Sequence, residues 1–444
     1  GREAKVDDPD RRRLLVLGAG RDQCFMLRCA RELGIETLAV DGDPDAPGRA
    51  LADDFAAVSN RDVRGILGAV ERLGKRVHGV STMGSDIPHV VAAVAQSLGL
   101  PSIPMEAAEA ARDKLRMKDC FARAGILVPE YRLVDSPARL SELLAAWGRI
   151  VLKPLRQAGS RGVSLVSAVE GLEPAWQRAL RFSEDGSILA ERFLPGDQIS
   201  SESLIVAGEV HTPGLADRNY EELERFLPQI MENGGWVPSR YRGEIGEIDR
   251  VIGACARALG IEDGVIKGDL VRTSEGRIAV IEVAARLSGG DFSESLVPLG
   301  TGVNYVKQVI RQAVGEAVDT SALRPARECA VANRYFFPPP GRLIAIEGVE
   351  AIAAKPWIRK LELWVRPGDT IPAIDSHGQR AGVFIVQAQE KQALSRYVQE
   401  VYESIGFVVE EASVSGPSPA GRRSTSRPRE RSGEEQGWRN ALRG

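Results

Sequence analysis

The first hundred residues alternate short runs of β-branched and other apolar residues with stretches of helical periodicity. One apolar run covers residues 14–17 and the next covers 36–40, and a helical pattern at 22–33 separates them. Strands that are separated by helices usually pair in parallel, because the crossover helix returns the chain to the same end of the sheet. This alternation predicts a Rossmann-like parallel-sheet domain of the α/β class over residues 13–105.

The 444 residues are more than one hydrophobic core normally organises, so we expect several compact units. Beyond the first domain the patterns are of the α+β class, and the stretch from Pro325 through Pro338–Gly341 marks a boundary before a small unit of its own. We predict the following segments: a flexible N-terminus at 1–12, the α/β domain at 13–105, a large domain at 106–318 with a small lid subdomain at 128–195, an α+β domain at 319–411, and a tail at 412–444.

The composition is that of an ordinary globular protein, with 43% hydrophobic and 27% charged residues and a net charge of -3. There is no overall basic field that would favour nucleic acid as the main partner, and no apolar run is long enough to suggest a bilayer span. The tail is rich in Arg, Ser and Pro and too poor in apolar residues to fold, so we expect it to be disordered. It either contacts a polyanion or keeps the chain soluble, and we favour the second role.

The 5 cysteines lie far apart without a CxxC spacing, which favours a reducing compartment and a cytoplasmic location. The 4 histidines are equally dispersed, so local spacing provides no Cys/His zinc site. Any metal is therefore expected to have oxygen ligands.

Gly18, Ala19 and Gly20 end a predicted strand and begin a predicted helix, and Asp41 follows at the distance typical of a dinucleotide-binding loop. The third glycine of that pattern is replaced by Gln23, whose side chain opposes close packing of the helix on the strand. An NAD-dependent oxidoreductase is therefore a minor alternative, beside a structural turn.

A stronger candidate for a nucleotide site follows the strand that ends at Lys153. Backbone amides of a Gly/Ser loop can approach phosphate closely, and a lysine at the edge of the loop supplies a positive charge. The loop residues expected at the phosphates are Gly159, Ser160, Arg161 and Gly162. An ordinary hairpin with a surface lysine is the alternative.

Two further segments could complete a nucleotide site. Lys114 lies on a helix expected from 105 to 124, where it could also be simply solvated. The strand that passes Glu191 ends at a Pro-Gly turn, where adenine could stack and hydrogen-bond beside Phe193 and Leu194, although a plain strand exit fits equally well.

Residues 265–283 predict a β-hairpin with its turn at Ser274 and Glu275, which places Asp269 opposite Val280 and one diagonal step from Glu282. In that register the two carboxylates share a face, about 7–8 Å apart or less. Oxygen-liganded Mg²⁺ that bridges phosphates would relieve their repulsion. The competing explanation is an ion pair between Glu282 and Lys267, which this register places opposite each other.

Loops beside this hairpin and after the predicted strand at 77–81 are candidates for substrate contact. Arg286 follows Glu282 by four residues, and its guanidinium suits a carboxylate or phosphoryl group. The second loop lies where ligands usually meet parallel sheets. The candidate substrate residues are Ser85, Asp86, Arg286, Ser288 and Gly289.

Together these segments resemble the ATP-grasp superfamily, and most closely its branch of bacterial L-amino-acid (dipeptide) ligases. The resemblance spans residues 13–410 and rests on the order and spacing of several motifs: Asp113-Lys114, Lys153-Pro154 with the glycine loop, Glu191–Leu194, Asp269, and Ile281–Arg286. It implies the ATP-grasp fold and an ATP-dependent carboxylate–amine ligase that works through an acyl phosphate. Small carboxylate and amine substrates, amino acids above all, and a homodimer are the partners we expect.

The resemblance also implies roles for single residues. Lys114, Lys153 and the glycine loop would contact the ATP phosphates, Glu191 to Leu194 would hold adenine, and Asp269 with Glu282 would bind Mg²⁺ or Mn²⁺. Arg286 and Lys153 would act in catalysis. Positioning and charge neutralisation, rather than a covalent enzyme nucleophile, would drive the reaction.

The chain departs from the family pattern at two places. Gln198, with Asp197 beside it, stands where many relatives have a ribose-binding glutamate, and Ala284 stands where many have a metal-binding asparagine. The second departure leaves the number of metal ions open and raises the alternative of a non-catalytic ATP sensor. Glu232 lies in a segment that resembles the border of the acceptor site, or else is a surface loop.

Overall fold

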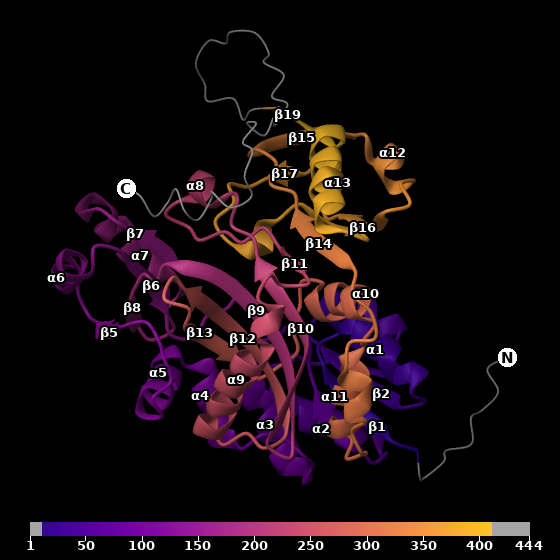
Figure 1. The fold of residues 1–444 in the computed structure, drawn as a ribbon. Coiled ribbons are helices and arrows are strands. Elements are labelled where there is room, and N and C mark those ends of the chain that lie inside the picture. Colours follow the sequence, from indigo (N-terminus) through magenta and orange to yellow (C-terminus); the bar gives the residue numbers. More distant parts are fainter. Residues whose placement is uncertain (1–10, 411–444) are drawn as a thin grey trace.

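The computed structural model describes residues 11–410. The predicted tail at 412–444 lies outside the described residues, as does the predicted flexible segment at 1–12 except for its last two residues. The described residues form four sheets (Figure 1).

The N-terminal sheet is parallel, as the sequence predicts, with the strand order β3-β2-β1-β4. Its strands are fully apolar where they are covered by helices on both sides, which is usual for parallel sheets. The elements are β1 (Arg13–Leu17), α1 (Arg21–Glu32), β2 (Glu36–Asp41), β3 (Asp54–Ala57), α2 (Val63–Leu73), β4 (Gly79–Ser81) and α3 (Pro88–Leu98).

The single helix expected from 105 to 124 is two helices, α4 (Met105–Arg112) and α5 (Lys114–Arg123). Asp113 interrupts them with an extended backbone, and its carboxylate accepts hydrogen bonds from the N–H groups of Leu115 and Arg116. Aspartate competes well for such N-cap positions, so a residue that the helical pattern absorbed starts a new helix instead. Lys114 is therefore the first residue of α5.

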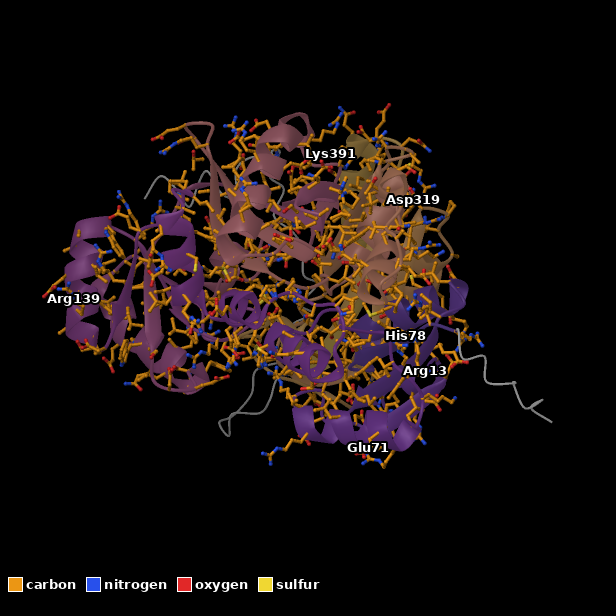
Figure 2. The ribbon with its side chains drawn as sticks, turned by 90° about the horizontal axis from the view of Figure 1, so that it is seen from below. Arg13, Glu71, His78, Arg139, Asp319 and Lys391 are labelled. Carbon is orange, nitrogen blue, oxygen red and sulfur yellow. The ribbon has the colours of Figure 1, made fainter. Side chains whose placement is uncertain are left out.

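Residues 131–192 form an antiparallel sheet of order β5-β8-β6-β7 with its own apolar cluster. Figure 2 shows this part, marked by Arg139, projecting to one side of the other parts, whereas Arg13 and His78 lie together in the N-terminal sheet. Its elements are β5 (Tyr131–Val134), α6 (Pro137–Trp147), β6 (Ile150–Pro154), β7 (Ser164–Val166), α7 (Leu172–Phe182) and β8 (Ile188–Arg192).

The largest sheet has eight strands, in the order β13-β12-β9-β10-β11-β14-β18-β16. It continues across the domain boundary predicted at residue 319, because β14 pairs with β11. Its elements are β9 (Gly196–Val206), β10 (Glu209–Arg218), α8 (Leu223–Phe226), β11 (Gly235–Val237), α9 (Ile245–Leu259), β12 (Gly264–Thr273), β13 (Ile278–Ala284), α10 (Val297–Thr301), α11 (Tyr305–Ala313), β14 (Ala330–Tyr335), β16 (Ile358–Leu363) and β18 (Gly382–Ala388).

In the C-terminal part, β14, β16 and β18 of the large sheet pack with the helix α13 (Lys391–Ser404). A separate three-stranded sheet of order β17-β15-β19 and one short helix complete this part. These elements are β15 (Gly341–Glu347), α12 (Val349–Ala353), β17 (Thr370–Ile371) and β19 (Gly406–Glu410).

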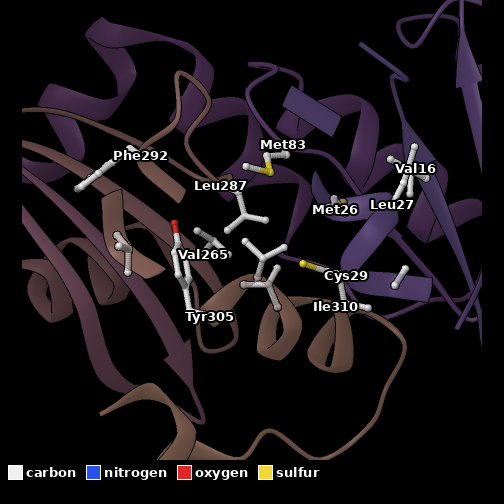
Figure 3. Close-up of a cluster of buried hydrophobic side chains, with 14 of the residues drawn as sticks. Val16, Met26, Leu27, Cys29, Met83, Val265, Leu287, Phe292, Tyr305 and Ile310 are labelled. Atoms are coloured by element: carbon white, nitrogen blue, oxygen red, sulfur yellow. The ribbon is translucent and has the colours of Figure 1, made fainter. Parts of the chain in front are cut away.

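The two faces of the large sheet pack against different parts of the chain. Successive side chains of a strand point to opposite faces. Ile266 is on the face that packs with α4, α5 and α9, whereas Val265 is on the face that packs with α1 and α11. Figure 3 shows this second cluster, in which Met26 and Cys29 of α1 lie near Ile310 of α11. The N-terminal sheet is thereby held against the face of the large sheet that carries Val265.

Gly79 is a point of close approach between the N-terminal sheet and α11. A Cβ atom at this position would lie 2.2 Å from the carbonyl oxygen of Ala313. We predict that Gly79→Ala lowers the free energy of unfolding in urea by about 1–3 kcal/mol, because the backbone of α11 must move away.

Gly246→Ala is the matched control, since a Cβ atom there meets nothing within 4 Å and the residue lies in the first turn of α9. It should leave stability unchanged or raise it by up to about 1 kcal/mol. Equal destabilisation by both substitutions would contradict the packing argument.

Candidate active site

The apolar face that carries Val265 becomes charged toward one end of the large sheet. Along β12 the same face continues with Lys267 and Asp269, and along the paired strand β9 it passes from Leu204 to Glu202. The period of two that builds the core therefore also aims these charged side chains toward the N-terminal sheet.

Asp269 and Glu282 lie directly opposite each other on β12 and β13. The predicted register was wrong: Asp269 does not face Val280, and Lys267 faces Ala284 rather than Glu282. The displacement at Asp269 is two residues and has two causes: beside the turn Leu270 already pairs with Val280 instead of Ala279, and a β-bulge between Asp269 and Leu270, which leaves Ile281 without a partner on β12, adds the second step. Directly opposed Cβ atoms are typically about 4.5–5.5 Å apart, so the carboxylates are brought closer together than the sequence indicated.

Cations surround this carboxylate pair. The Lys267 ammonium bonds Asp269, Arg218 Nη1 lies 2.9 Å from Asp269 Oδ1, and Lys114 Nζ lies 3.6 Å from Glu282 Oε2. Burial by itself raises the pKa of Asp269, but the charges of Lys267 and Arg218 outweigh it and lower the pKa to about 2. Asp269 is therefore a carboxylate at neutral pH.

The pair fits a Mg²⁺ ion that brings further ligands of its own. No group of three or more His, Cys, Asp or Glu residues among residues 11–410 is arranged to hold a metal. Mg²⁺ is usually bound by one or two carboxylates together with substrate phosphates and water. Asp269 and Glu282 satisfy that requirement without a third protein carboxylate.

The buried carboxylate of Glu191, in β8, pairs with two lysines. Lys153 Nζ lies 2.9 Å from Glu191 Oε2, and Lys118 Nζ lies 3.1 Å from Glu191 Oε1. Burial by itself raises the pKa of Glu191, but Lys118 and Lys153 lower it. Lys118 lies one helical turn after Lys114 on α5 and also donates to the Ile281 carbonyl at 2.8 Å. No sequence motif singled it out.

The glycine loop has a strained backbone. Gly159, Ser160 and Gly162 have φ of 64°, 59° and 74°, which lie in the left-handed region of the Ramachandran plot. Ser160 is one of few non-glycine residues among residues 11–410 with such a backbone. Lys114 Nζ donates to the carbonyl of Gln157 at 2.7 Å, so the lysine lies against the loop. Arg161 instead bonds the loop itself, through Nε to the Ala158 carbonyl at 3.2 Å.

The expected adenine and ribose contacts lie where the chain passes from β8 to β9. Phe193 is buried and Leu194 half-buried. Gln198 Oε1 accepts a hydrogen bond from the Tyr220 hydroxyl at 2.6 Å, and the carboxylate of Asp197 accepts one from Tyr241. Both ribose candidates are therefore oriented by neighbouring tyrosines.

The structure joins two of the predicted substrate residues. Arg286 Nε donates to Asp86 Oδ1 at 2.7 Å, and the charge of Arg286 overcomes the effect of burial and lowers the pKa of Asp86. A parallel bridge between Met83 and Leu287, with the Gly84 N–H bonded to the Leu287 carbonyl at 3.0 Å, aligns the two loops.

Two other predicted substrate residues lie beside this junction. A Cβ atom on Gly289 would lie 2.4 Å from the Asp22 carboxylate, so Gly289 lies against this side chain of α1. Ser85 Oγ accepts a hydrogen bond from Gln23 Nε2 at 3.4 Å. The loops from the N-terminal and large sheets thus form one surface.

Glu202 is a buried acid that the sequence did not single out. Ser288 and the Tyr305 hydroxyl both bond its carboxylate, and Tyr305 also bonds Ser293. Burial raises the pKa of Glu202 to about 7. The sequence shows an acidic residue in the middle of the segment that forms the long strand β9, which is unusual. Only the fold shows that this residue is fully buried.

Glu232 connects the site to the C-terminal part of the chain. Its carboxylate lies 3.6 Å from Arg218 and 3.1 Å from Arg380, and Arg380 also bonds its carbonyl. The segment around Glu232 is therefore not a detached surface loop. It joins Arg218, Asp269, Lys267 and Glu282 in one group of charged side chains, called the charged cluster below. Arg380 is about 150 residues away in sequence, and no local pattern signalled it.

The loop at Gly18 uses its own amide groups. The Ala19 N–H donates to Asp41 Oδ2 at 2.8 Å, and the Gly20 N–H donates to Gln23 Oε1 at 2.8 Å. In dinucleotide-binding loops these amides and the acidic residue serve the ligand. The geometry therefore favours the structural turn over the NAD site.

Residues 111–290 match the family model "ATP-grasp domain", and residues 334–410 match "L-amino acid ligase C-terminal domain 2". Every candidate site residue except Ser85 and Asp86 lies within the first match. Residues 111–290 form an ATP-grasp domain.

Individual proteins agree with this assignment. The protein y4rH of Sinorhizobium fredii is 26% identical over 416 residues, which are 91% of this ATP-grasp chain and 84% of that protein. A D-alanine–D-alanine ligase of Aromatoleum aromaticum is 29% identical over 195 residues, 43% of this chain and 60% of that enzyme. The crystal structure of an L-amino acid ligase from Bacillus licheniformis has a TM-score of 0.75 at 20% identity, with 90% of this chain and 99% of that chain covered. The predicted ATP-grasp fold is confirmed.

Within residues 11–410 of this ATP-grasp chain, no helix is both long and apolar enough to cross a membrane. All five cysteines are unpaired.

We predict that Glu202 makes the stability of the protein depend on pH. Its pKa is raised on folding from an ordinary value of 4.5 to about 7, so its contribution is fully present below pH 4.5 and is lost as pH rises through 7. Between pH 5 and 8 this group alone should lower the free energy of unfolding by about 3 kcal/mol.

The measurement is urea unfolding of the wild type and of Glu202→Gln at pH 5 to 8. Glutamine resembles the protonated acid and can still bond Ser288 and Tyr305, so the variant should lose most of this pH dependence. Parallel pH profiles for both proteins would show that Glu202 does not titrate in this range.

Proposed function

We propose that the protein is an ATP-dependent ligase that joins a carboxylate to an amine through an acyl phosphate and releases ADP and phosphate. The observation that carries the proposal is the direct opposition of Asp269 and Glu282, with Lys114 3.6 Å from Glu282. Two ionised carboxylates beside cations suit a Mg²⁺-bound polyphosphate chain. The charged cluster next to them provides contacts for the substrates.

In this proposal Lys114, Lys153 and the loop Gly159–Gly162 bind the phosphates of ATP. Residues 191–194 hold adenine, with Asp197 and Gln198 at the ribose. Asp269 and Glu282 hold Mg²⁺, which when bound neutralises charge that develops on the phosphates.

Arg286 orients the substrate carboxylate. It pairs with Asp86 in the structure, and exchange of that partner for a substrate carboxylate keeps its charge compensated. One carboxylate oxygen attacks the γ-phosphorus and ADP leaves. The nitrogen of the amine then attacks the acyl carbon, phosphate leaves with the bonding electrons, and the nitrogen releases a proton.

Amino acids are the proposed substrates. The support is the match of residues 334–410 to an L-amino acid ligase domain, together with the names of the relatives, which include ligases that act on D-alanine. Ser85, Asp86, Glu232, Ser288 and Gly289 would surround the substrates, since they lie around the junction of the two loops or in the charged cluster. A reducing compartment such as the cytoplasm suits the unpaired cysteines.

The test is phosphate release from ATP and Mg²⁺ across pairs of amino acids and other carboxylic acids. Turnover is expected only when a carboxylate and an amine are both present, and mass spectrometry of the product should show the condensed pair. Nucleotide binding with background turnover throughout the screen would instead favour a non-catalytic ATP sensor, the alternative to which Ala284 points.

Glu282→Gln removes one metal-binding charge without changing the shape of the side chain. We predict a loss of turnover of about 100-fold or more, because metal contributions to the transition state amount to several kcal/mol. The thermal midpoint should stay close to that of the wild type, since the substitution removes one of two opposed like charges.

Glu275→Gln is the matched control on the same hairpin, where the exposed Glu275 pairs only with Arg277 in its turn. It should retain wild-type turnover. A fully active Glu282→Gln enzyme would sink the metal assignment.

We also predict that ATP with Mg²⁺ raises the thermal midpoint and that NAD(H) does not, because only a ligand that binds the native state stabilises it. Stabilisation by NAD(H) alone would revive the oxidoreductase alternative at Gly18.

A further inference from the structure

The segment 375–380 forms a short, internally bonded turn between β17 and β18. It contains a single 3₁₀ turn at His377–Gln379 with a capping box at its start. Gln379 Oε1 accepts hydrogen bonds from the N–H groups of Asp375 and Ser376, at 2.6 and 3.1 Å. The turn therefore keeps its shape without help from a ligand.

Charged contacts anchor both ends of this turn to other parts of the chain. At one end Arg178 of α7 bonds the Asp375 carbonyl and lies 3.5 Å from its carboxylate. At the other end Arg380 pairs with Glu232 at 3.1 Å, and its guanidinium lies 3.7 Å from the centre of the Tyr335 ring. The turn thus spans from the lid subdomain to the charged cluster.

His377, in the middle of the turn, contacts the glycine loop. Its backbone N–H donates to the Gly159 carbonyl at 3.3 Å. Gly159 and Ser160 are the residues whose left-handed backbone shapes this loop. The C-terminal part of the chain is thereby placed at the loop to which we assign the ATP phosphates.

His377 is half-buried, and its Nε2 atom is buried without a hydrogen-bond partner among the described residues. The charged groups that act on it most strongly are the cations Arg380, Arg218 and Lys267, and burial together with these cations lowers its pKa well below the ordinary value. The carboxylates among these cations, Asp269, Glu232 and Glu282, pair with the cations rather than with His377. A neutral imidazole N–H in such surroundings is suited to donate to an oxyanion.

We propose that His377 Nε2–H donates a hydrogen bond to an oxygen of the terminal phosphoryl group of bound ATP, so that the C-terminal part of the chain supplies a catalytic residue. The inference rests on the proposed function, because it requires ATP at the loop Gly159–Gly162. Two oxyanions could accept the bond, the phosphoryl group and a substrate carboxylate. His377 contacts Gly159 of the loop that we assign to the ATP phosphates, and the nearby cations Lys267 and Arg218 pair with Asp269, which we assign to the metal. Both observations favour the phosphoryl group.

The experiment measures nucleotide affinity by calorimetry on the full chain with Mg²⁺, so that it does not depend on turnover. The non-hydrolysable analogue AMP-PNP carries a γ-phosphoryl group, which ADP lacks. His377→Ala should weaken AMP-PNP binding about tenfold, as expected for a hydrogen bond to a charged group, and leave ADP binding unchanged. Unchanged ADP binding also shows that the variant is folded.

His377→Gln is the rescue variant, because its amide nitrogen can occupy the place of Nε2, and it should recover most of the AMP-PNP affinity. His211→Ala, on β10, is the matched control and should bind both nucleotides normally. Equal weakening of AMP-PNP and ADP by His377→Ala would overturn the proposal and make His377 a support for the glycine loop.

The remaining outcomes separate this inference from the proposed function. Unchanged AMP-PNP affinity in His377→Ala, with a raised KM for the carboxylate or amine alone, would overturn the proposal in favour of a substrate contact. Failure of the wild type to bind either nucleotide would overturn the ATP site itself. AMP-PNP-specific weakening in a protein without ligase turnover would support the His377 contact while contradicting the ligase.

Discussion

The direct opposition of Asp269 and Glu282 is the constraint on which the rest of the site depends. Two carboxylates on facing residues of a hairpin repel each other, and burial of Asp269 increases the cost of its charge. The structure compensates with Lys267, Arg218 and Lys114. The arrangement is electrostatically balanced for a cation and a polyphosphate, and it is poorly suited to an apolar ligand.

The charged site is a continuation of the hydrophobic core. On β12 and β9 the residues that pack against α1 and α11 are followed on the same face by Lys267, Asp269 and Glu202. A rigid core directly below a charged cluster fixes the side chains of that cluster at little further entropic cost. The same packing holds the N-terminal sheet in place, which brings Asp86 to Arg286.

Three parts of the chain contribute to the site, and charged contacts connect them. Glu191 of the lid subdomain holds Lys153 and Lys118, Asp86 of the N-terminal sheet holds Arg286, and Arg380 of the C-terminal part holds Glu232. Each contact uses a group that we also assign to a ligand or place beside one. Ligand binding and the relative positions of the parts are therefore expected to influence each other.

The sequence by itself determined the parallel N-terminal sheet, the hairpin that carries Asp269 and Glu282, and the glycine loop after Lys153, because local periodicity and glycine content decide such elements. It did not determine the register of the hairpin, since the pairing beside the turn is one residue off the predicted register and the bulge at Ile281 adds a second residue at Asp269. Only the tertiary structure decided that Glu202 is buried and that Arg380 and His377 reach the site. Those contacts join segments at least 86 residues apart, and no local pattern records which distant segments a fold brings together.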